Sequence, residues 1–240
     1  MRYAILSDIH ANLPALEAVL EEIRVLGVDK YLCLGDIVGY GAQPRECLEL
    51  VQGLSERTVA GNHDFAALGK IDIDNFNEHA REATLWTRRT LKEEDLDYLR
   101  SLPLVHHYDG FSIVHGTLYS PELFDYIQTS YDAFLSISQL PGEVCFLGHS
   151  HIPVTFIQRR FITYSFETEF TVESGTKVLV NVGSVGQPRD NNPNASYAIF
   201  DTAVRKVTLR RVAYDVGAAA ASIREAGLPE VLGERLKIGR

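Results

Sequence analysis

The chain has 240 residues, of which 45% are hydrophobic and 23% charged, and its formal net charge is −9. This composition is typical of a soluble globular protein and excludes disordered, collagen-like and membrane-spanning classes. The acidic balance also argues against binding extended nucleic acid, which requires a broad positive surface. We expect a single domain over residues 1–240, located in the cytoplasm, without a membrane segment. The three cysteines fit a reducing compartment, because an odd count within apolar runs indicates core thiols.

The first third of the chain alternates short apolar strands with amphipathic helices. Strands are predicted over residues 3–6, 31–34 and 58–60. A helix follows Asn12, a suitable N-cap, and ends at Gly27, while Pro44 opens a second helix. This alternation predicts parallel strands joined by right-handed crossovers.

The remainder of the chain is first helical and then rich in strands. Residues 75–102 predict two charged helices that meet near Leu91 and could overhang a site. An Asp109-Gly110 turn predicts a hairpin between residues 104–107 and 111–114. Further strands are expected over residues 144–147, 154–157, 161–166, 177–182, 197–200 and 206–212, followed by a helix over 215–226.

Five polar clusters stand where apolar strands end. They are Asp8-Ile9-His10, Gly35-Asp36, Gly61-Asn62-His63-Asp64, His115-Gly116 and Gly148-His149-Ser150-His151. In open α/β sheets the carboxyl ends of strands converge on one crevice, so these clusters are expected to meet there. Single motifs of this kind are common, but Asp-x-His, Gly-Asn-His and Gly-His-x-His together arise by chance in only about one chain in ten thousand.

The side chains in these clusters are suited to a dinuclear metal site. Imidazole and carboxylate ligands together favour manganese, iron, zinc or nickel over magnesium or calcium. One carboxylate can bridge two ions about 3.5 to 4 Å apart, and such pairs catalyse phosphoryl displacement. We therefore expect two divalent transition-metal ions, with manganese the first choice in vitro. They would supply the local positive charge that the acidic composition lacks.

The five clusters, in this order, resemble the calcineurin-like metallophosphoesterases over about residues 1–186. The resemblance implies a four-layer α/β/β/α sandwich of two mixed sheets flanked by helices. It also implies that Asp36 bridges two metals, that a hydroxide between them is the nucleophile, and that His63 is a general acid or transition-state stabiliser. One metal would be held by Asp8, His10 and His151, and the other by Asn62, His115 and His149.

Departures from the family narrow the expected substrate to a small phosphate ester. The protein phosphatases of this superfamily have Asp, Arg and Gly after their Gly-Asp, whereas this chain has Ile37-Val38-Gly39 after Gly35-Asp36. The opening motif and the segment 181–189 look like the small bacterial and archaeal branch, which implies a phosphodiesterase more than a phosphomonoesterase. Within that segment Arg189 could grip a substrate phosphate or form a surface salt bridge.

Two other functions are compatible with the sequence. One is a non-catalytic interaction module, because the retromer subunit resembles this fold. The metal site of that subunit is degraded, whereas the ligand set of this chain is intact, which speaks against this function. The other is a nuclease, which the low basic charge disfavours. The basic residues between 75 and 102, namely His79, Arg81, Arg88 and Arg89, are interpreted as a solvated helix face. Substrate, native metal, oligomeric state and any lid motion of residues 75–102 are left open by the sequence.

Overall fold

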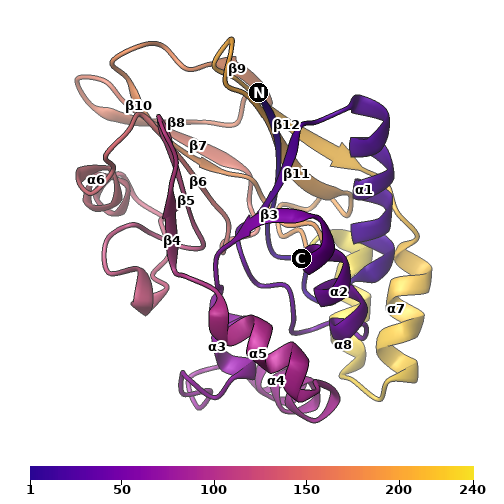
Figure 1. Ribbon diagram of the computed structural model, residues 1–240. Helices are drawn as coiled ribbons and strands as arrows, with labels where there is room; N and C mark the ends of the chain where they lie inside the picture. The colour runs from indigo at the N-terminus through magenta and orange to yellow at the C-terminus, as the bar shows by residue number, and fades with distance from the viewer.

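Two six-stranded mixed sheets form the centre of the computed structural model, which describes residues 1–240 (Figure 1). The strand orders are β3-β2-β1-β11-β12-β9 in the first sheet and β4-β5-β6-β10-β7-β8 in the second. The strands are β1 (Arg2–Leu6), β2 (Lys30–Cys33), β3 (Ser55–Thr58), β4 (Val105–His107), β5 (Phe111–Val114), β6 (Val144–Leu147), β7 (Val154–Gln158), β8 (Ile162–Ser165), β9 (Glu169–Thr171), β10 (Lys177–Asn181), β11 (Ala195–Asp201) and β12 (Lys206–Val212).

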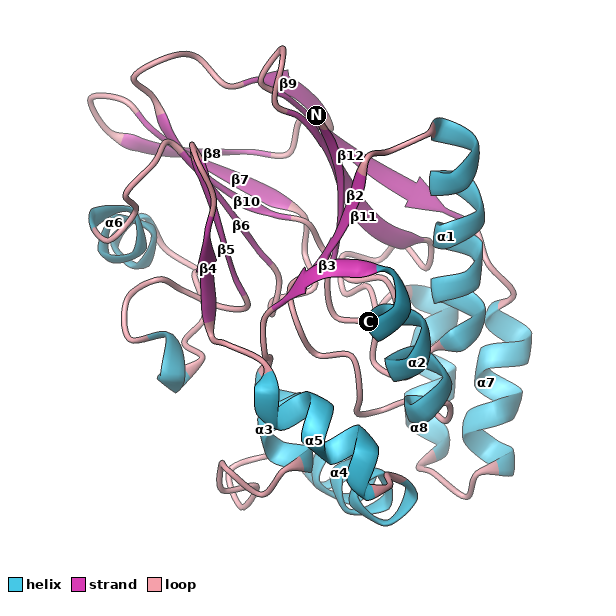
Figure 2. Ribbon diagram, viewed as in Figure 1, coloured by secondary structure: helices cyan, strands magenta, loops and turns pink.

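Helices cover the outer faces of both sheets, as Figure 2 shows. Helices α1, α2, α7 and α8 lie outside the first sheet, α6 lies outside the second, and α3 to α5 gather beyond one end of the sheets. Their bounds are α1 (Leu13–Leu26), α2 (Pro44–Leu54), α3 (Asn62–Ala67), α4 (Glu78–Thr90), α5 (Glu93–Ser101), α6 (Ser130–Ser138), α7 (Val216–Glu225) and α8 (Glu230–Glu234), with short 3-10 turns η1 (Pro121–Leu123) and η2 (Arg235–Ile238). The predicted four-layer sandwich is confirmed. No helix is long and apolar enough to cross a membrane.

The sheets pack face to face through side chains that alternate along each strand. In β1, Ile5 points into the layer shared with Phe111 and Phe146 of the second sheet. Its neighbours Ala4 and Leu6 point to the opposite face, against the helices. Because side chains alternate with a period of two, a strand that is buried on both faces is apolar throughout. This explains why the central strands were readily predicted.

Most predicted boundaries agree with the structure, and the third strand is the clear exception. The side chain of Asn12 accepts from the Ala15 N–H at 3.2 Å and caps α1. The strand expected at residues 58–60 instead occupies Ser55–Thr58. It lies at the edge of its sheet, so polar residues are tolerated there, and the chain turns away where the Ala60 N–H donates to Pro103 O. The sequence also failed to predict α6 and β9.

Candidate metal centre

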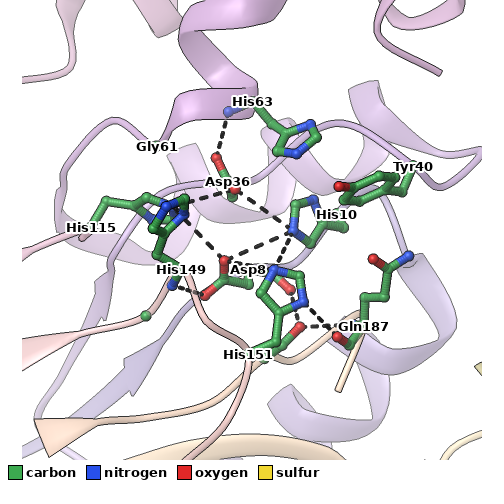
Figure 3. Close-up of polar contacts among 12 residues, drawn as sticks. Asp8, His10, Asp36, Tyr40, Gly61, His63, His115, His149, His151 and Gln187 are labelled. Atoms are coloured by element: carbon green, nitrogen blue, oxygen red, sulfur yellow. Dashed lines mark hydrogen bonds and ion pairs between the residues drawn. The ribbon is translucent and has the colours of Figure 1, made fainter. Parts of the chain in front are cut away.

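Loops that leave both sheets at the same end bring six side chains into one cluster (Figure 3). Asp8 and Asp36 follow β1 and β2 of the first sheet, while His115 and His149 follow β5 and β6 of the second. His10 and His151 complete the cluster. All six side chains are at most 5% exposed. Burying ionisable groups in this way is costly unless they are paired or bind a metal.

The first group of potential ligands consists of Asp8, His10 and His151. The His10 and His151 Nε2 atoms are 3.1 Å apart, and Asp8 Oδ1 lies 3.2 Å from His151 Nε2. The Nδ1–H groups of both histidines point at backbone carbonyls, Val38 O at 3.2 Å and Gln187 O at 2.6 Å. Each ring therefore presents an Nε2 lone pair to the other, an arrangement that a cation between them would stabilise.

The second group consists of Asp36, His115 and His149. His115 donates its Nδ1–H to Leu34 O at 2.7 Å, and its Nε2 lies 3.2 Å from His149 Nδ1. These spacings suit a metal, because bonds of about 2.0–2.1 Å to imidazole leave neighbouring ligand atoms about 3 Å apart. Asn62, at the start of α3, lines the same cleft as His149, and its buried Oδ1 accepts no hydrogen bond from the protein.

Two carboxylates connect the groups. Asp36 Oδ2 lies 3.7 Å from His10 Nε2 and 3.3 Å from His115 Nε2. Asp8 Oδ1 lies 3.9 Å from His115 Nε2 and accepts no hydrogen bond from the protein although it is buried. Unsatisfied buried acceptors are rare and costly, so this atom and Asn62 Oδ1 fit a divalent cation. The residues present therefore fit the metal ions that the sequence predicts.

The charge distribution supports the same assignment. Burial lowers the pKa of His149 to about 3 and holds that of His10 well below its usual value, so both rings are neutral and free to donate a lone pair. Burial also tends to lower the pKa of His115, but the negative charges of Asp36 and Asp8 outweigh this effect and raise the pKa to about 9. The two carboxylates thus stabilise a positive charge within the cluster.

The backbone that carries these side chains is strained. Asp8, His10, Asp36, His149 and His151 all have φ between 50° and 68°. Non-glycine residues rarely adopt this left-handed region, at a cost of about 1–3 kcal/mol each. Such strain is typical of sites whose side chains must be held in one orientation. Gly61 and Gly148 are required alongside, because a Cβ would collide with the Asp36 carboxylate and the Asp8 carboxylate respectively.

Asp64 holds the loop of Asp36 in place. Its carboxylate accepts from the N–H groups of Asp36 at 2.8 Å, Ile37 at 3.0 Å, Val38 at 3.3 Å and Gly61 at 3.0 Å. The sequence placed Asp64 in a polar cluster but gave it no role. The position of Asp64, two residues after Asn62 in the first turn of a helix, could have indicated this role, because carboxylates bind free N–H groups there.

The segment 181–189 performs the same task for the other loops. The Ser184 hydroxyl donates to Asp8 O at 2.7 Å, and the Asn181 side-chain amide donates to Gly148 O and to the Ser150 hydroxyl. Gln187 O accepts from His151 as described above. The segment, interpreted from sequence as a turn with a family signature, therefore supports two of the loops that carry potential ligands, that of Asp8 and that of residues 148–151.

His63 lies beside the cluster on the wall of an open cleft. Its N–H donates to Asp36 Oδ1 at 2.8 Å, and its ring packs between Tyr40 and Phe76, with centroid distances of 4.4 and 5.2 Å. Burial lowers the pKa of His63 to about 4. The Asp36 carboxylate acts to raise this pKa, and the positive charge of Arg189 acts to lower it further. Its Nδ1 accepts no hydrogen bond from the protein. The ring is available to a substrate in the cleft.

Two clefts share Tyr126 as a wall beside this cluster. One, of about 490 Å³, is lined by Asn62, His63 and His149 together with the start of α4. The other, of about 640 Å³, is lined by Ser150, Arg189 and the aromatic rings of Tyr164 and Phe166. Tyr126 lines both and stacks on the His149 ring at a centroid distance of 3.9 Å. No local sequence pattern points to Tyr126 or Tyr40, because an aromatic residue in a loop usually serves only to pack against its neighbours.

The basic residues of α4 lie away from the cluster. His79, Arg81 and Arg89 are exposed, as the interpretation as a solvated face requires. Arg88 differs, because it is half-buried and its guanidinium donates to Ala66 O at 2.6 and 2.9 Å. It fastens α4 to α3. The three cysteines are free and buried, as predicted.

Comparisons with known proteins identify the family of the chain. Residues 1–205 match the calcineurin-like phosphoesterase superfamily domain. The chain is 43% identical to MJ0912 of Methanocaldococcus jannaschii, over 99% of this chain and 98% of that protein. It is 25% identical to phosphodiesterase YfcE of Escherichia coli, over 86% and 91% of the two chains. The crystal structure of a metallophosphoesterase from Sphaerobacter thermophilus superposes with a TM-score of 0.89, at 41% identity over 100% and 99% of the chains. The chain therefore belongs to the calcineurin-like phosphoesterase superfamily.

Proposed function

We propose that the chain is a dinuclear metal-dependent phosphodiesterase acting on a small substrate. The observation that carries this proposal is the pair of imidazole lone pairs at 3.1 Å beside an unsatisfied buried carboxylate oxygen, in a cluster whose His149 lines an open cleft. Two transition-metal ions, such as manganese, are assigned to seven ligands, namely Asp8, His10, Asp36, Asn62, His115, His149 and His151. Asp36 would connect the two ions, since its Oδ2 lies within 3.7 Å of His10 Nε2 and 3.3 Å of His115 Nε2.

The residues of the chain perform distinct tasks in this proposal. When bound, the ions provide Lewis acidity and lower the pKa of water, so that attack on phosphorus occurs near neutral pH. The strained loops hold the carboxylates and imidazoles in a fixed arrangement, which avoids reorganisation during the reaction. His63 faces the cleft and donates a hydrogen bond or a proton to the leaving oxygen. Tyr126 stacks on the His149 ring and covers one of its faces.

The two clefts favour a diester over a monoester. A phosphodiester carries an organic group on either side of phosphorus, and the clefts on the two sides of Tyr126 provide a place for each. A monoester would occupy only one of them. The E. coli relative YfcE is named as a phosphodiesterase, which agrees with this choice. The three free, buried cysteines support action in a reducing compartment, which we take to be the cytoplasm.

The test combines metal analysis with two matched esters. Protein purified without chelators is analysed for bound metals and assayed with bis-para-nitrophenyl phosphate and para-nitrophenyl phosphate, with and without manganese. We expect about two metal equivalents and preferential turnover of the diester. His79→Ala, which removes an exposed histidine, is the control and should behave as the parent protein.

Other outcomes would redirect the proposal. Two metals with preferential turnover of the monoester would make the chain a phosphomonoesterase. Two metals with no turnover of either ester would favour a non-catalytic interaction module. Cleavage of single- or double-stranded DNA would favour a nuclease.

A further inference from the structure

Two arginines from distant parts of the chain converge on one tyrosine beside the candidate metal centre. Arg189 follows the segment that supports the ligand loops, and Arg235 begins the C-terminal turn η2. Their guanidinium carbons lie 5.7 and 4.5 Å from the centroid of the Tyr40 ring. Both donate to Gln187 Oε1, at 3.2 Å from Arg189 and 2.5 Å from Arg235. Arg189 also donates to the Tyr40 hydroxyl at 3.3 Å.

Neither arginine has a compensating negative charge. No carboxylate lies within 4.0 Å of either guanidinium group, and the side chains that they contact are a neutral amide and a phenol. Both residues are half-buried, and Arg235 Nε is buried without an acceptor. Burial lowers the pKa of Arg235 to about 10, and the charge of Arg189 acts in the same direction. Two like charges held together in this way favour the binding of an anion.

The pair lies next to the site of the proposed reaction. The Tyr40 ring that carries it contacts His10 and His63 at centroid distances of 4.7 and 4.4 Å. The Arg189 N–H donates to His151 O at 3.3 Å, and its side chain lines the second cleft. An anion held by the two guanidinium groups would therefore be adjacent to a phosphoryl group at the metals, without occupying the same position.

We propose that Arg189 and Arg235 form a subsite for a second phosphate of the substrate, next to the phosphate that is hydrolysed. Two guanidinium forks provide several N–H donors and two positive charges, which match a phosphate better than a carboxylate. Arg235 lies outside residues 1–205, the part that matches the superfamily domain, so the C-terminal segment adds this subsite to the common fold. The inference rests on the proposed function and names its substrate class, an ester that carries a second phosphate.

The test uses two ligands that differ by one phosphate. AMP and α,β-methylene-ADP are titrated calorimetrically into the full-length manganese-loaded protein, and metal content is measured for every variant. We expect the parent protein to bind the diphosphate analogue about tenfold or more tightly than AMP, as for one added charge-assisted contact. Arg235→Gln should remove that preference and change the affinity for AMP less than about twofold.

Further variants make the result interpretable. Arg189→Gln should have the same effect and provides a second measurement if Arg235→Gln does not fold. Arg159→Gln, which removes an exposed arginine paired with Glu173, is the control. Equal weakening of both ligands would show that the pair grips the single phosphate at the metals, and unchanged binding of both would show a structural role. Either result overturns the subsite. Because the readout is binding, it is independent of whether the parent protein hydrolyses bis-para-nitrophenyl phosphate.

Discussion

At the scale of single residues, the roles of His63 and Asp36 are separable. His63 lines the cleft and contacts the cluster through its N–H, which donates to Asp36 Oδ1, and through its ring, whose centroid is 5.0 Å from that of His10. The Asp36 carboxylate instead lies near ligands of both groups. We expect His63→Ala to retain both metals and to lose about 10²- to 10⁴-fold in kcat. Asp36→Asn should lose metal as well as activity. Metal analysis and steady-state kinetics on the same preparations test this, and equal metal loss in both variants would show that His63 is a ligand.

Asp64 contributes through the backbone that it holds. Replacing its carboxylate by an amide places an N–H donor against backbone N–H groups, so Asp64→Asn should destabilise the protein by about 3 kcal/mol or more and loosen Asp36. Burial and the Asp36 charge raise the pKa of Asp64 to about 7, although the N–H groups that donate to its carboxylate act to lower this pKa. Urea unfolding is therefore best measured at pH 8, where the carboxylate is ionised. Asp97→Asn on the exposed face of α5 is the control, with a change below about 0.5 kcal/mol. Similar losses for both variants would contradict the role of Asp64 as a clamp.

At the scale of elements, prediction succeeds where a strand or helix is buried in a regular pattern and fails where a contact joins residues far apart in the sequence. The central strands were evident because both faces are buried, and α1 because its cap and apolar period agree. The edge strand β3 was misplaced because an edge needs no apolar run. The potential ligands were found because they follow parallel strands, whose ends meet. Arg235 was not found, because a C-terminal turn reaches the site only through tertiary packing that no local pattern encodes.

The helices α4 and α5 lie beside the first cleft, and their contacts argue against a mobile lid. Arg88 donates two hydrogen bonds to Ala66 O, Tyr98 OH donates to Thr58 Oγ1 at 3.2 Å, and Leu99 is fully buried. Both helices are therefore fastened to the core, and we expect the cleft to keep its shape when substrate enters.

Removing the Arg88 contact should loosen the helix that carries Asn62 and His63. We expect Arg88→Ala to destabilise the protein by about 1–3 kcal/mol and to speed amide exchange in α3. Arg89→Ala, an exposed neighbour on the same helix, should change neither. Urea unfolding and hydrogen exchange measure both effects. Rapid exchange throughout residues 78–101 of the parent protein would instead indicate a lid.

At the scale of the whole molecule, the candidate metal centre joins the two sheets. The first sheet contributes Asp8 and Asp36, and the second contributes His115 and His149. Ligands from both sheets come together only in the folded protein, so the free energy of metal binding adds to the free energy of unfolding. Bound metal also neutralises carboxylates that are otherwise buried side by side.

Metal removal should therefore lower the stability of the entire fold and not of one loop. At a free metal concentration 1,000 times the dissociation constant, linkage adds about 4 kcal/mol, so calorimetry should show a large fall in Tm after EDTA and its recovery with manganese. Asp36→Asn should show little response to either treatment, while His79→Ala should respond as the parent protein does. If the ions bound only one sheet, EDTA would speed amide exchange near that sheet alone. Exchange that rises equally in β1 and β6 would establish that the metals hold the two sheets together.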